Sequence, residues 1–239
     1  MRLLIILSLL VPFVSAQAFE AAYITSGTSE YKVEEMPSIK RINWTSDELK
    51  LMKSAIDNLS KSMPEPGIQV GEQAPDFSLI NAQGKHVTLY DELKKGPVVL
   101  VFYRGAWCPY CNMQLRSLRK NLPLFKKYNA QLLTVTPQTP DKSEAQFKKE
   151  GYPFEVLSDL DYEVLKGYKL YYELPENLIQ LYKKHNIDIV SFNGEGRTAL
   201  PVPGTFIIDN DGIVRAMVAQ TDYKVRMKTS DIIYELEQL

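Results

Sequence analysis

Two cysteines, Cys108 and Cys111, are the feature that most constrains the fold of this chain. They are the only cysteines in its 239 residues, and they stand in the stretch Arg-Gly-Ala-Trp-Cys-Pro-Tyr-Cys over residues 104–111. An apolar run at 97–103 precedes this stretch, and leucines recur behind it at helical spacing. The pattern predicts a buried strand, a turn that carries both sulfurs, and a helix that begins at the turn.

The spacing of the cysteines predicts redox chemistry. Two intervening residues let the sulfurs close a small disulfide at the first helical turn, where unpaired N–H groups and the helix dipole favour a thiolate. Such a position lowers the pKa of a cysteine from about 8.5 to about 7 or below. Pro109 suits the first turn of a helix, which does not need the N–H group that proline lacks.

Other roles for the cysteine pair have less support. A zinc site needs two more ligands, and His86 and His185 are far apart in the sequence, without paired spacing. A structural disulfide across two residues closes a loop too small to add much stability. We therefore expect a redox-active disulfide between Cys108 and Cys111, and no metal. A nucleotide cofactor is not expected either, because the chain has no glycine-rich phosphate loop.

Residues 1–18 predict a signal peptide. Arg2 is followed by an apolar stretch up to residue 14 and then by small residues, so that cleavage is expected after Ala16 or Ala18. The apolar stretch is shorter than the about 20 residues of a spanning helix, and an uncleaved anchor is the alternative. We expect an exported protein, periplasmic or secreted, in a compartment where thiols tend to oxidise.

The rest of the chain divides into an N-terminal extension and one domain. The extension, residues 19–70, carries one amphipathic helix over about 46–63 that opens with a capping box from Thr45 to Glu48. The domain, residues 71–239, alternates strands and helices, which indicates an α/β sandwich with a central mixed sheet flanked by helices. The net charge of −1, without a basic excess, argues against a nucleic-acid partner.

An insert at about 160–200 interrupts the alternation of strands and helices in this domain. It is rich in tyrosine and has helical character over 162–171 and 175–185. Packing is the favoured role of these tyrosines, and a substrate or partner surface is the alternative.

Hydrophobic periodicity predicts the other elements of the domain. Helices are expected at 109–128, which Pro123 kinks or splits, at 139–150, and at the C-terminus through Leu236 with Ser230 or Thr229 as its cap. Strands are expected at 77–80, 86–89, 97–103, 131–135, 154–157, 205–208 and 213–218.

Three stretches of this sequence resemble a known family. The opening Gly-Glu-Gln-Ala-Pro-Asp-Phe at 71–77, and Phe-Ile-Ile-Asp at 206–209 with Gly212, resemble the redoxin group. This group is the peroxiredoxin and alkyl hydroperoxide reductase branch of the thioredoxin-like fold. Residues 104–111, with Leu115 and Arg116 behind them, resemble a peroxiredoxin-like subgroup that carries a Trp-Cys-Pro-Tyr-Cys turn. The resemblance covers about 71–239 and implies a thioredoxin-like sandwich.

At two positions the chain departs from the peroxiredoxin pattern. A gap-free alignment places a threonine of the family on Cys108 and its peroxide-attacking cysteine on Cys111. The family also has an arginine two residues ahead of Thr205, where this chain has Pro203. Disulfide enzymes of the thioredoxin type carry a cis proline at that position, so the bond between Val202 and Pro203 is a candidate cis bond.

One activity that the resemblance implies is the reduction of a hydroperoxide. A thiolate would attack the hydroperoxide and become a sulfenic acid, and the second cysteine would resolve it to a disulfide. A thioredoxin-like reductant or a membrane thiol donor would restore the dithiol. Arg104, with Arg116 as a second candidate, would replace the missing arginine; a solvated surface role is the alternative for both.

The other implied activity is disulfide exchange with protein substrates. Cys108 would then be the exposed nucleophile and Cys111 the resolving cysteine, with Trp107 shielding the pair and Pro203 aligning a substrate chain. The helix start favours Cys108 as nucleophile and the alignment favours Cys111; we expect Cys108. The leading interpretation is a thiol-dependent peroxidase, the alternative is an exported thiol-disulfide oxidoreductase, and the third is a redox-inactive binding module.

Overall fold

The computed structural model describes residues 28–30 and 42–239. The predicted signal peptide and most of the segment that follows it lie outside these residues. Within the described part of the chain, no helix is both long enough and apolar enough to cross a bilayer.

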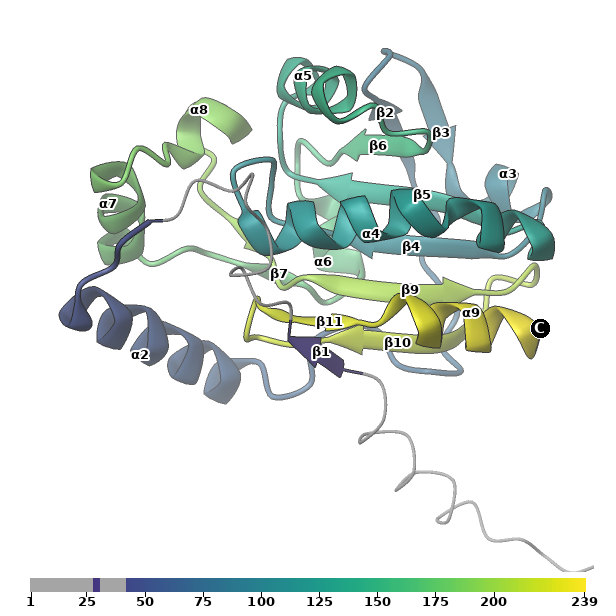
Figure 1. The fold of residues 1–239 in the computed structure, drawn as a ribbon, viewed down its shortest axis with the longest axis horizontal. Coiled ribbons are helices and arrows are strands. Elements are labelled where there is room, and N and C mark those ends of the chain that lie inside the picture. Colours follow the sequence, from purple (N-terminus) through teal and green to yellow (C-terminus); the bar gives the residue numbers. More distant parts are fainter. Residues whose placement is uncertain (1–27, 31–41) are drawn as a thin grey trace, which may run out of the picture.

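A seven-stranded mixed sheet forms the centre of the molecule, in the order β10-β9-β4-β5-β6-β2-β3 (Figure 1). Three neighbouring strands run parallel, namely β4 (Val98–Phe102), β5 (Gln131–Thr136) and β6 (Glu155–Ser158). The other four pair antiparallel: β2 (Ser78–Asn81), β3 (His86–Thr88), β9 (Gly204–Ile208) and β10 (Val214–Ala219). Every residue of β4 is buried and apolar, as expected for a strand covered on both faces.

Helices cover both faces of this sheet, and alternate residues of β4 divide between the two cores. Val99 and Val101 face α4 (Pro109–Phe125) and α9 (Thr229–Glu237), which lie side by side on one face (Figure 1). The same core reaches Tyr152, which directly follows α5 (Pro140–Glu150) and its C-cap glycine. The opposite core contains residues of α3 (Leu89–Leu93) and α6 (Glu163–Gly167). The predicted sandwich is therefore confirmed.

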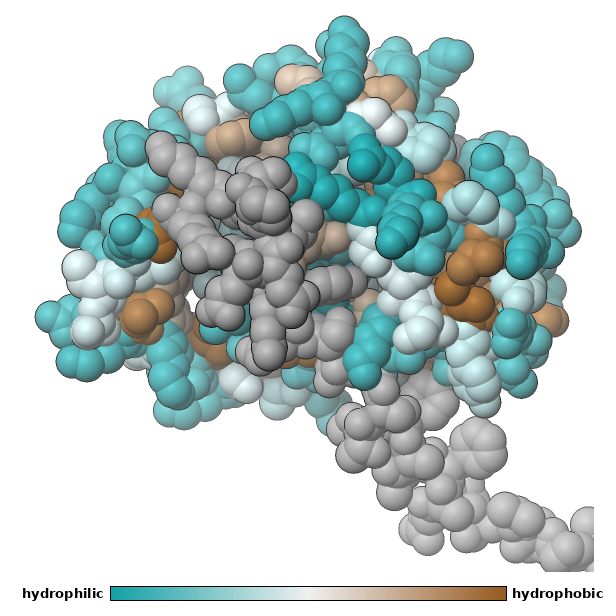
Figure 2. All heavy atoms as spheres, viewed as in Figure 1, coloured by the Kyte–Doolittle hydropathy of each residue, from teal (hydrophilic) through white to brown (hydrophobic). Residues whose placement is uncertain are grey.

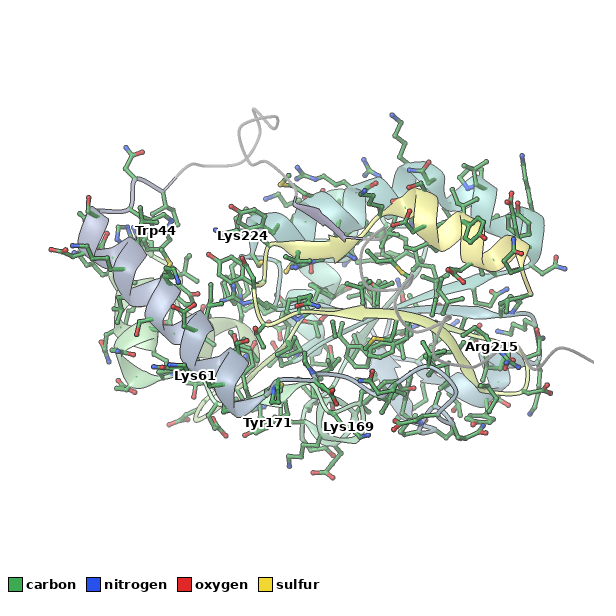
Figure 3. All side chains as sticks on the ribbon, turned by 90° about the horizontal axis from the view of Figure 1, so that it is seen from below. Trp44, Lys61, Lys169, Tyr171, Arg215 and Lys224 are labelled. Atoms are coloured by element: carbon green, nitrogen blue, oxygen red, sulfur yellow. The ribbon has the colours of Figure 1, made fainter. Side chains whose placement is uncertain are left out.

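A smaller lobe lies beside the sheet and has an apolar cluster of its own. It is built from α2 (Ser46–Ser62), α7 (Glu176–Lys184) and α8 (Ile189–Asn193), and Trp107 packs against its edge. Figure 3 shows α2 set apart from the central sheet, with Trp44 just before its first turn and Lys61 near its other end. Figure 2 shows a mostly hydrophilic surface with scattered apolar side chains.

Several predicted elements are confirmed. The capping box of α2 is present, with the Thr45 hydroxyl accepting from the Glu48 amide and the Glu48 carboxylate accepting from the Thr45 amide. The predicted helix over 175–185 is α7. Pro123 does not split α4, which continues to Phe125 and passes into a 3-10 turn, Lys126–Tyr128.

Other elements differ from the prediction. The helix expected over 162–171 is limited to α6, because Tyr171 and Tyr172 form a strand, β7, that pairs with β8 (Leu200–Pro201). The strand β11 (Val225–Met227), which pairs with β1 (Thr28–Glu30), was not predicted, and neither were α3 and α8. Neither Thr229 nor Ser230 caps α9. Its N-cap is Lys228, and the Thr229 hydroxyl lies 2.9 Å from the Ser117 hydroxyl on α4.

Glu48 joins α2 to the end of α7. Its buried carboxylate accepts hydrogen bonds from Lys184 Nζ at 2.8 Å and from the Thr45 amide at 2.8 Å, and it lies 3.0 Å from His185 Nε2. The ring of Trp44 packs on that of His185, with centroids 4.4 Å apart. The bond from Lys184, followed by those from Thr45 and His185, lowers the pKa of Glu48 from 4.5 to about 2.

We expect Glu48→Gln to remove part of the pH dependence of stability. A carboxylate whose pKa is lower in the folded state stabilises it above the unfolded pKa, and this contribution disappears as the pH falls through the folded pKa. The window for Glu48 therefore runs from about 4.5 down to about 2. Urea unfolding at pH 6 and pH 3 measures the effect. Asp57→Asn, which removes an exposed ion pair with Lys53 on the same helix, is the matched control. If the free energy of unfolding changes equally between pH 6 and pH 3 in the two variants, the prediction is wrong.

Candidate active site

The two sulfurs lie together at the start of α4, directly after the loop that follows β4. Cys108 is the N-cap of α4 and Pro109 its first residue, and the Asn112 amide donates to the Cys108 carbonyl at 3.1 Å to close the first turn. Both cysteines are reduced and fully buried, and their Sγ atoms are 2.7 Å apart. The structure therefore places the predicted pair in the strand, turn and helix arrangement that its spacing indicated.

Arg104 lies in an aromatic cage next to the cysteines. Its Nη2 donates to the Tyr182 hydroxyl at 2.7 Å, and its guanidinium carbon is 4.7 Å from the ring centroid of Trp107 and 4.4 Å from that of Tyr223. These distances are typical of cation–π contacts. Arg104 is only 2% exposed, so the alternative of a solvated surface arginine is wrong for this residue.

Arg226, on β11, was not identified from the sequence, and its side chain contacts a sulfur. Its Nη2 lies 3.5 Å from Cys111 Sγ, and its Nη1 donates to the Val225 carbonyl at 2.7 Å and to the Tyr223 carbonyl. Its side chain is fully buried. No local pattern distinguishes it from the many charged residues near the C-terminus, because its partner is more than a hundred residues away in sequence.

Arg116, the second arginine considered from the sequence, forms an ion pair with Glu150 instead. Its Nε and Nη2 donate to the two carboxylate oxygens at 2.8 and 2.9 Å. This two-point contact joins α4 to the end of α5.

Pro203 lies between β8 and β9, next to the end of β4, where Gly204 pairs with Phe102. The expected cis bond before it is wrong, because the described residues contain no cis peptide. The Val202 amide donates to the Leu170 carbonyl at 2.7 Å, which anchors the chain ahead of the proline. The bond takes the ordinary trans form of an X–Pro peptide.

A buried polar network holds the loop that carries the sulfurs. Gln138 Oε1 accepts from the Ala106 amide at 2.7 Å, and Asn112 Nδ2 donates to the Ala106 carbonyl at 2.6 Å. Gln146 connects both side chains, with Nε2 3.0 Å from Asn112 Oδ1 and Oε1 3.3 Å from Gln138 Nε2, and it also accepts from the Tyr103 hydroxyl at 2.8 Å. Because almost all of these groups are paired, the loop has one defined position over the helix start.

Gly105 is required by this loop conformation. Its φ of +146° lies in a region that side chains rarely adopt, and a Cβ there would lie 2.5 Å from Trp107 Nε1. Glycine lets the indole of Trp107 fold back over the loop, beside Arg104.

The electrostatics of the site favour a thiolate on Cys111. Burial raises the pKa of both thiols. For Cys111 this is outweighed by the hydrogen bond from the Cys108 thiol and by the positive charges of Arg226 and Arg104, so its pKa is lowered. The pKa of Cys108 is raised, chiefly by burial and then by Cys111. Two adjacent buried thiols do not both ionise, and the second one stays protonated.

The other ionisable groups near the sulfurs are phenols. Burial raises the pKa of Tyr172 to about 12, and it raises the pKa values of Tyr103 and Tyr223 as well. These phenols are therefore neutral at physiological pH. Among residues 28–30 and 42–239, neither Arg104 nor Arg226 has a carboxylate partner, so two guanidinium groups face one thiolate.

The histidines lie away from this site. His86 is exposed on β3, and His185 binds Glu48 in the smaller lobe. The described residues include no group of three or more His, Cys, Asp or Glu side chains that could hold a metal ion.

Comparison with known sequences relates the chain to two kinds of thiol enzyme. Residues 70–217 match the AhpC/TSA family. A putative peroxiredoxin of Mycobacterium tuberculosis is 30% identical over 154 residues, which cover 64% of this chain and 85% of that protein. Peroxiredoxin Bcp of Escherichia coli is 32% identical over 106 residues, which cover 44% and 67%. The thiol-disulfide oxidoreductase ResA of Geobacillus kaustophilus is 27% identical over 173 residues, which cover 72% and 79%.

The fold of this chain is similar to that of solved peroxiredoxin structures. Peroxidoxin BcpB from Mycobacterium tuberculosis aligns with a TM-score of 0.58 at 20% identity, covering 72% of this chain and 98% of that one. Peroxiredoxin Q from Xanthomonas campestris aligns with a TM-score of 0.52 at 19% identity, covering 68% and 90%. The predicted thioredoxin-like fold is thus confirmed, whereas the subgroup with a Trp-Cys-Pro-Tyr-Cys turn stays a prediction.

Proposed function

This chain belongs to the AhpC/TSA family, and from that premise we propose that it is a peroxiredoxin-like thiol peroxidase that reduces hydroperoxides through Cys108 and Cys111. Its relatives include peroxiredoxins and a thiol-disulfide oxidoreductase, so it is a thiol oxidoreductase at the level of the family. The observation that carries the finer proposal is the burial of both sulfurs beside two guanidinium groups.

This arrangement suits a small substrate with a polar O–O bond. Neither sulfur has exposed surface, so any substrate must enter through a local movement, and a hydroperoxide needs a much smaller opening than a protein disulfide does. The guanidinium groups of Arg104 and Arg226 stabilise a thiolate before the reaction and a leaving alkoxide during it, which is how fixed positive charge accelerates such a step.

The proposed cycle begins when a thiolate attacks the terminal oxygen of the hydroperoxide. The S–O bond forms, the O–O bond breaks, and an alkoxide leaves and takes up a proton, which yields a sulfenic acid and an alcohol. The second cysteine attacks the sulfenic sulfur, so that the S–S bond forms and water leaves. A dithiol donor of the thioredoxin type then exchanges with the disulfide and returns both cysteines to the reduced state.

The second candidate is disulfide exchange with protein substrates. The position of Cys108 at the N-terminus of α4, followed by Pro109, favours it, because this is the usual place of an exchanging cysteine. The similarity to a thiol-disulfide oxidoreductase also supports it. It requires a larger movement around the sulfurs than a hydroperoxide does, because both sulfurs are buried.

Stopped-flow mixing of the reduced protein with hydrogen peroxide separates the two candidates. We expect oxidation of the dithiol much faster than that of free cysteine, and a rate equal to that of free cysteine would exclude the peroxidase. Reduction of insulin in the presence of dithiothreitol tests the exchange activity. Failure in both assays would favour the third interpretation, a redox-inactive binding module.

We also propose that the protein works outside the cytoplasm, on the basis of its predicted signal peptide at residues 1–18. Its reductant would then be a thioredoxin-like protein or a membrane thiol donor of that compartment. N-terminal sequencing of the protein recovered from cells tests this proposal, with a first residue at 17 or 19 as the expected result.

A further inference from the structure

Arg226 is a buried cation without a carboxylate to balance it. It is 2% exposed, and it forms no ion pair within residues 28–30 and 42–239. Burying a guanidinium group costs several kcal/mol unless an anion and hydrogen bonds compensate it. Two backbone carbonyls accept from its Nη1. Its Nη2 lies 3.5 Å from Cys111 Sγ, which can carry a negative charge.

The backbone of β11 fixes the place of this side chain. β11 pairs with β1 in a two-stranded sheet, with Ser29 opposite Arg226, and it contacts β9 and β10 of the central sheet. The two carbonyls that hold the guanidinium group belong to Val225 and Tyr223, immediately ahead of it in the chain. The cation is therefore directed at the sulfur by its own strand.

One donor of Arg226 has no partner. Its Nε is buried and makes no hydrogen bond to any described residue, and the same holds for Arg104 Nε. A buried N–H group without an acceptor destabilises the fold, so its retention in a reactive site needs an explanation. An oxygen-rich substrate at the sulfur would supply the acceptor.

We infer that Arg226 is a catalytic residue that holds Cys111 as the thiolate and donates to the hydroperoxide, so that Cys111 attacks the substrate and Cys108 resolves the product. This inference rests on the proposed peroxidase function. In this assignment Pro203, at the position of the family arginine, has no catalytic role, and the positive charge comes from Arg226 on β11 instead. It also reverses the order expected from the helix start, where Cys108 would lead.

The chemistry of this assignment balances. Cys111 Sγ gives an electron pair to the terminal oxygen of the hydroperoxide, becomes a sulfenic acid, and releases an alkoxide whose charge the guanidinium groups offset. The Cys108 thiol then loses its proton and attacks Cys111 Sγ. The disulfide forms and hydroxide leaves as water, so one hydroperoxide and two thiols give an alcohol, water and a disulfide.

Arg104 has a different position in the same site. Its guanidinium group lies between Trp107 and Tyr223 and binds the Tyr182 hydroxyl, whereas its hydrogen bond to Cys111 is made by the backbone. Its charge acts on both sulfurs from a distance. Loss of the Arg226 side chain should therefore raise the pKa of the Cys111 thiol more than loss of the Arg104 side chain.

The variant Arg226→Gln tests the inference, with Arg226→Lys as the conservative variant that keeps the charge. The pKa of the thiolate is read from its ultraviolet absorbance as a function of pH, and the peroxide rate from stopped-flow mixing across the same range. We expect Arg226→Gln to raise the thiolate pKa by at least about one unit and to slow peroxide oxidation at pH 7 at least about tenfold. Arg226→Lys should recover part of both.

Arg215→Gln is the matched control, because Arg215 lies on the neighbouring β10 and pairs with Asp209 at 2.5 Å, half-exposed and outside the site. It should leave both readouts unchanged. If the wild-type protein reacts quickly with peroxide and Arg226→Gln matches it in rate and thiolate pKa, the inference is wrong and the proposed function stands. If the wild-type protein itself reacts no faster than free cysteine, the proposed function fails first. Circular dichroism of each variant confirms that it is folded.

Discussion

Cys111→Ser should abolish the reaction with hydroperoxide, whereas Cys108→Ser should keep its first step and lose turnover. The asymmetry follows from the charges at the site: Arg226 contacts Cys111 Sγ and lowers its pKa, while burial raises the pKa of Cys108. Only a thiolate attacks the O–O bond at a useful rate. Removing the reactive nucleophile of an enzyme typically costs a factor of at least about a thousand.

Trapping of the sulfenic acid measures this difference directly. After one equivalent of hydrogen peroxide, Cys108→Ser should rapidly form a dimedone adduct at residue 111. Cys111→Ser should form no adduct at residue 108 in the same time. Serine is nearly isosteric with cysteine, so both variants keep the packing of the helix start. A rapid adduct at residue 108 would instead assign the attack to the cysteine at the helix N-cap, as we first expected from its position.

The strand, turn and helix around the sulfurs could be predicted because their signals are local. The apolar run of β4, the two cysteines and Pro109 stand next to one another in sequence, and each favours the same structure. The capping box at Thr45 is local in the same way, since its two hydrogen bonds join residues three apart.

The errors arise where a distant segment decides the local structure. Tyr171 follows a helical pattern, but it pairs with Pro201 in a two-stranded sheet, so the helix ends early. Thr229 has the residue type of an N-cap, yet its hydroxyl lies against Ser117 on α4. In both cases tertiary contacts override a local preference of only about 1 kcal/mol or less.

The role of Arg226 in the charge balance of the site could not be predicted either, because it too depends on a contact between distant segments. Arg226 lies on a strand of three residues, too short for a periodic pattern, and its contact with Cys111 crosses most of the domain. The sequence shows that the arginine of the family is missing ahead of Thr205, but it does not show which of the other arginines faces the sulfur. That choice depends on how β11 packs beside β9 and β10.

The wild-type protein should resist over-oxidation by peroxide, and Cys108→Ser should be sensitive to it. Cys108 Sγ lies 2.7 Å from Cys111 Sγ, and a disulfide bond measures about 2.05 Å, so little movement is needed to trap the sulfenic acid. A neighbouring group held in this way acts at an effective concentration of about 10⁵ M or more, far above that of any second peroxide molecule. The sulfenic acid is therefore consumed before it can be oxidised to a sulfinic acid.

Mass spectrometry of the intact proteins provides the test, after cycles of hydrogen peroxide with dithiothreitol as the reductant. Cys108→Ser should gain two oxygen atoms at residue 111 at peroxide concentrations at least about tenfold lower than the wild-type protein needs. Gln83→Ala, in the exposed turn between β2 and β3, is a control that should behave as wild type. Equal sensitivity of wild type and Cys108→Ser would mean that the two sulfurs, although adjacent in the reduced protein, do not meet after the first oxidation. Formation of the disulfide would then require a movement at the start of α4, and this movement would make the step as slow as the attack of a second peroxide.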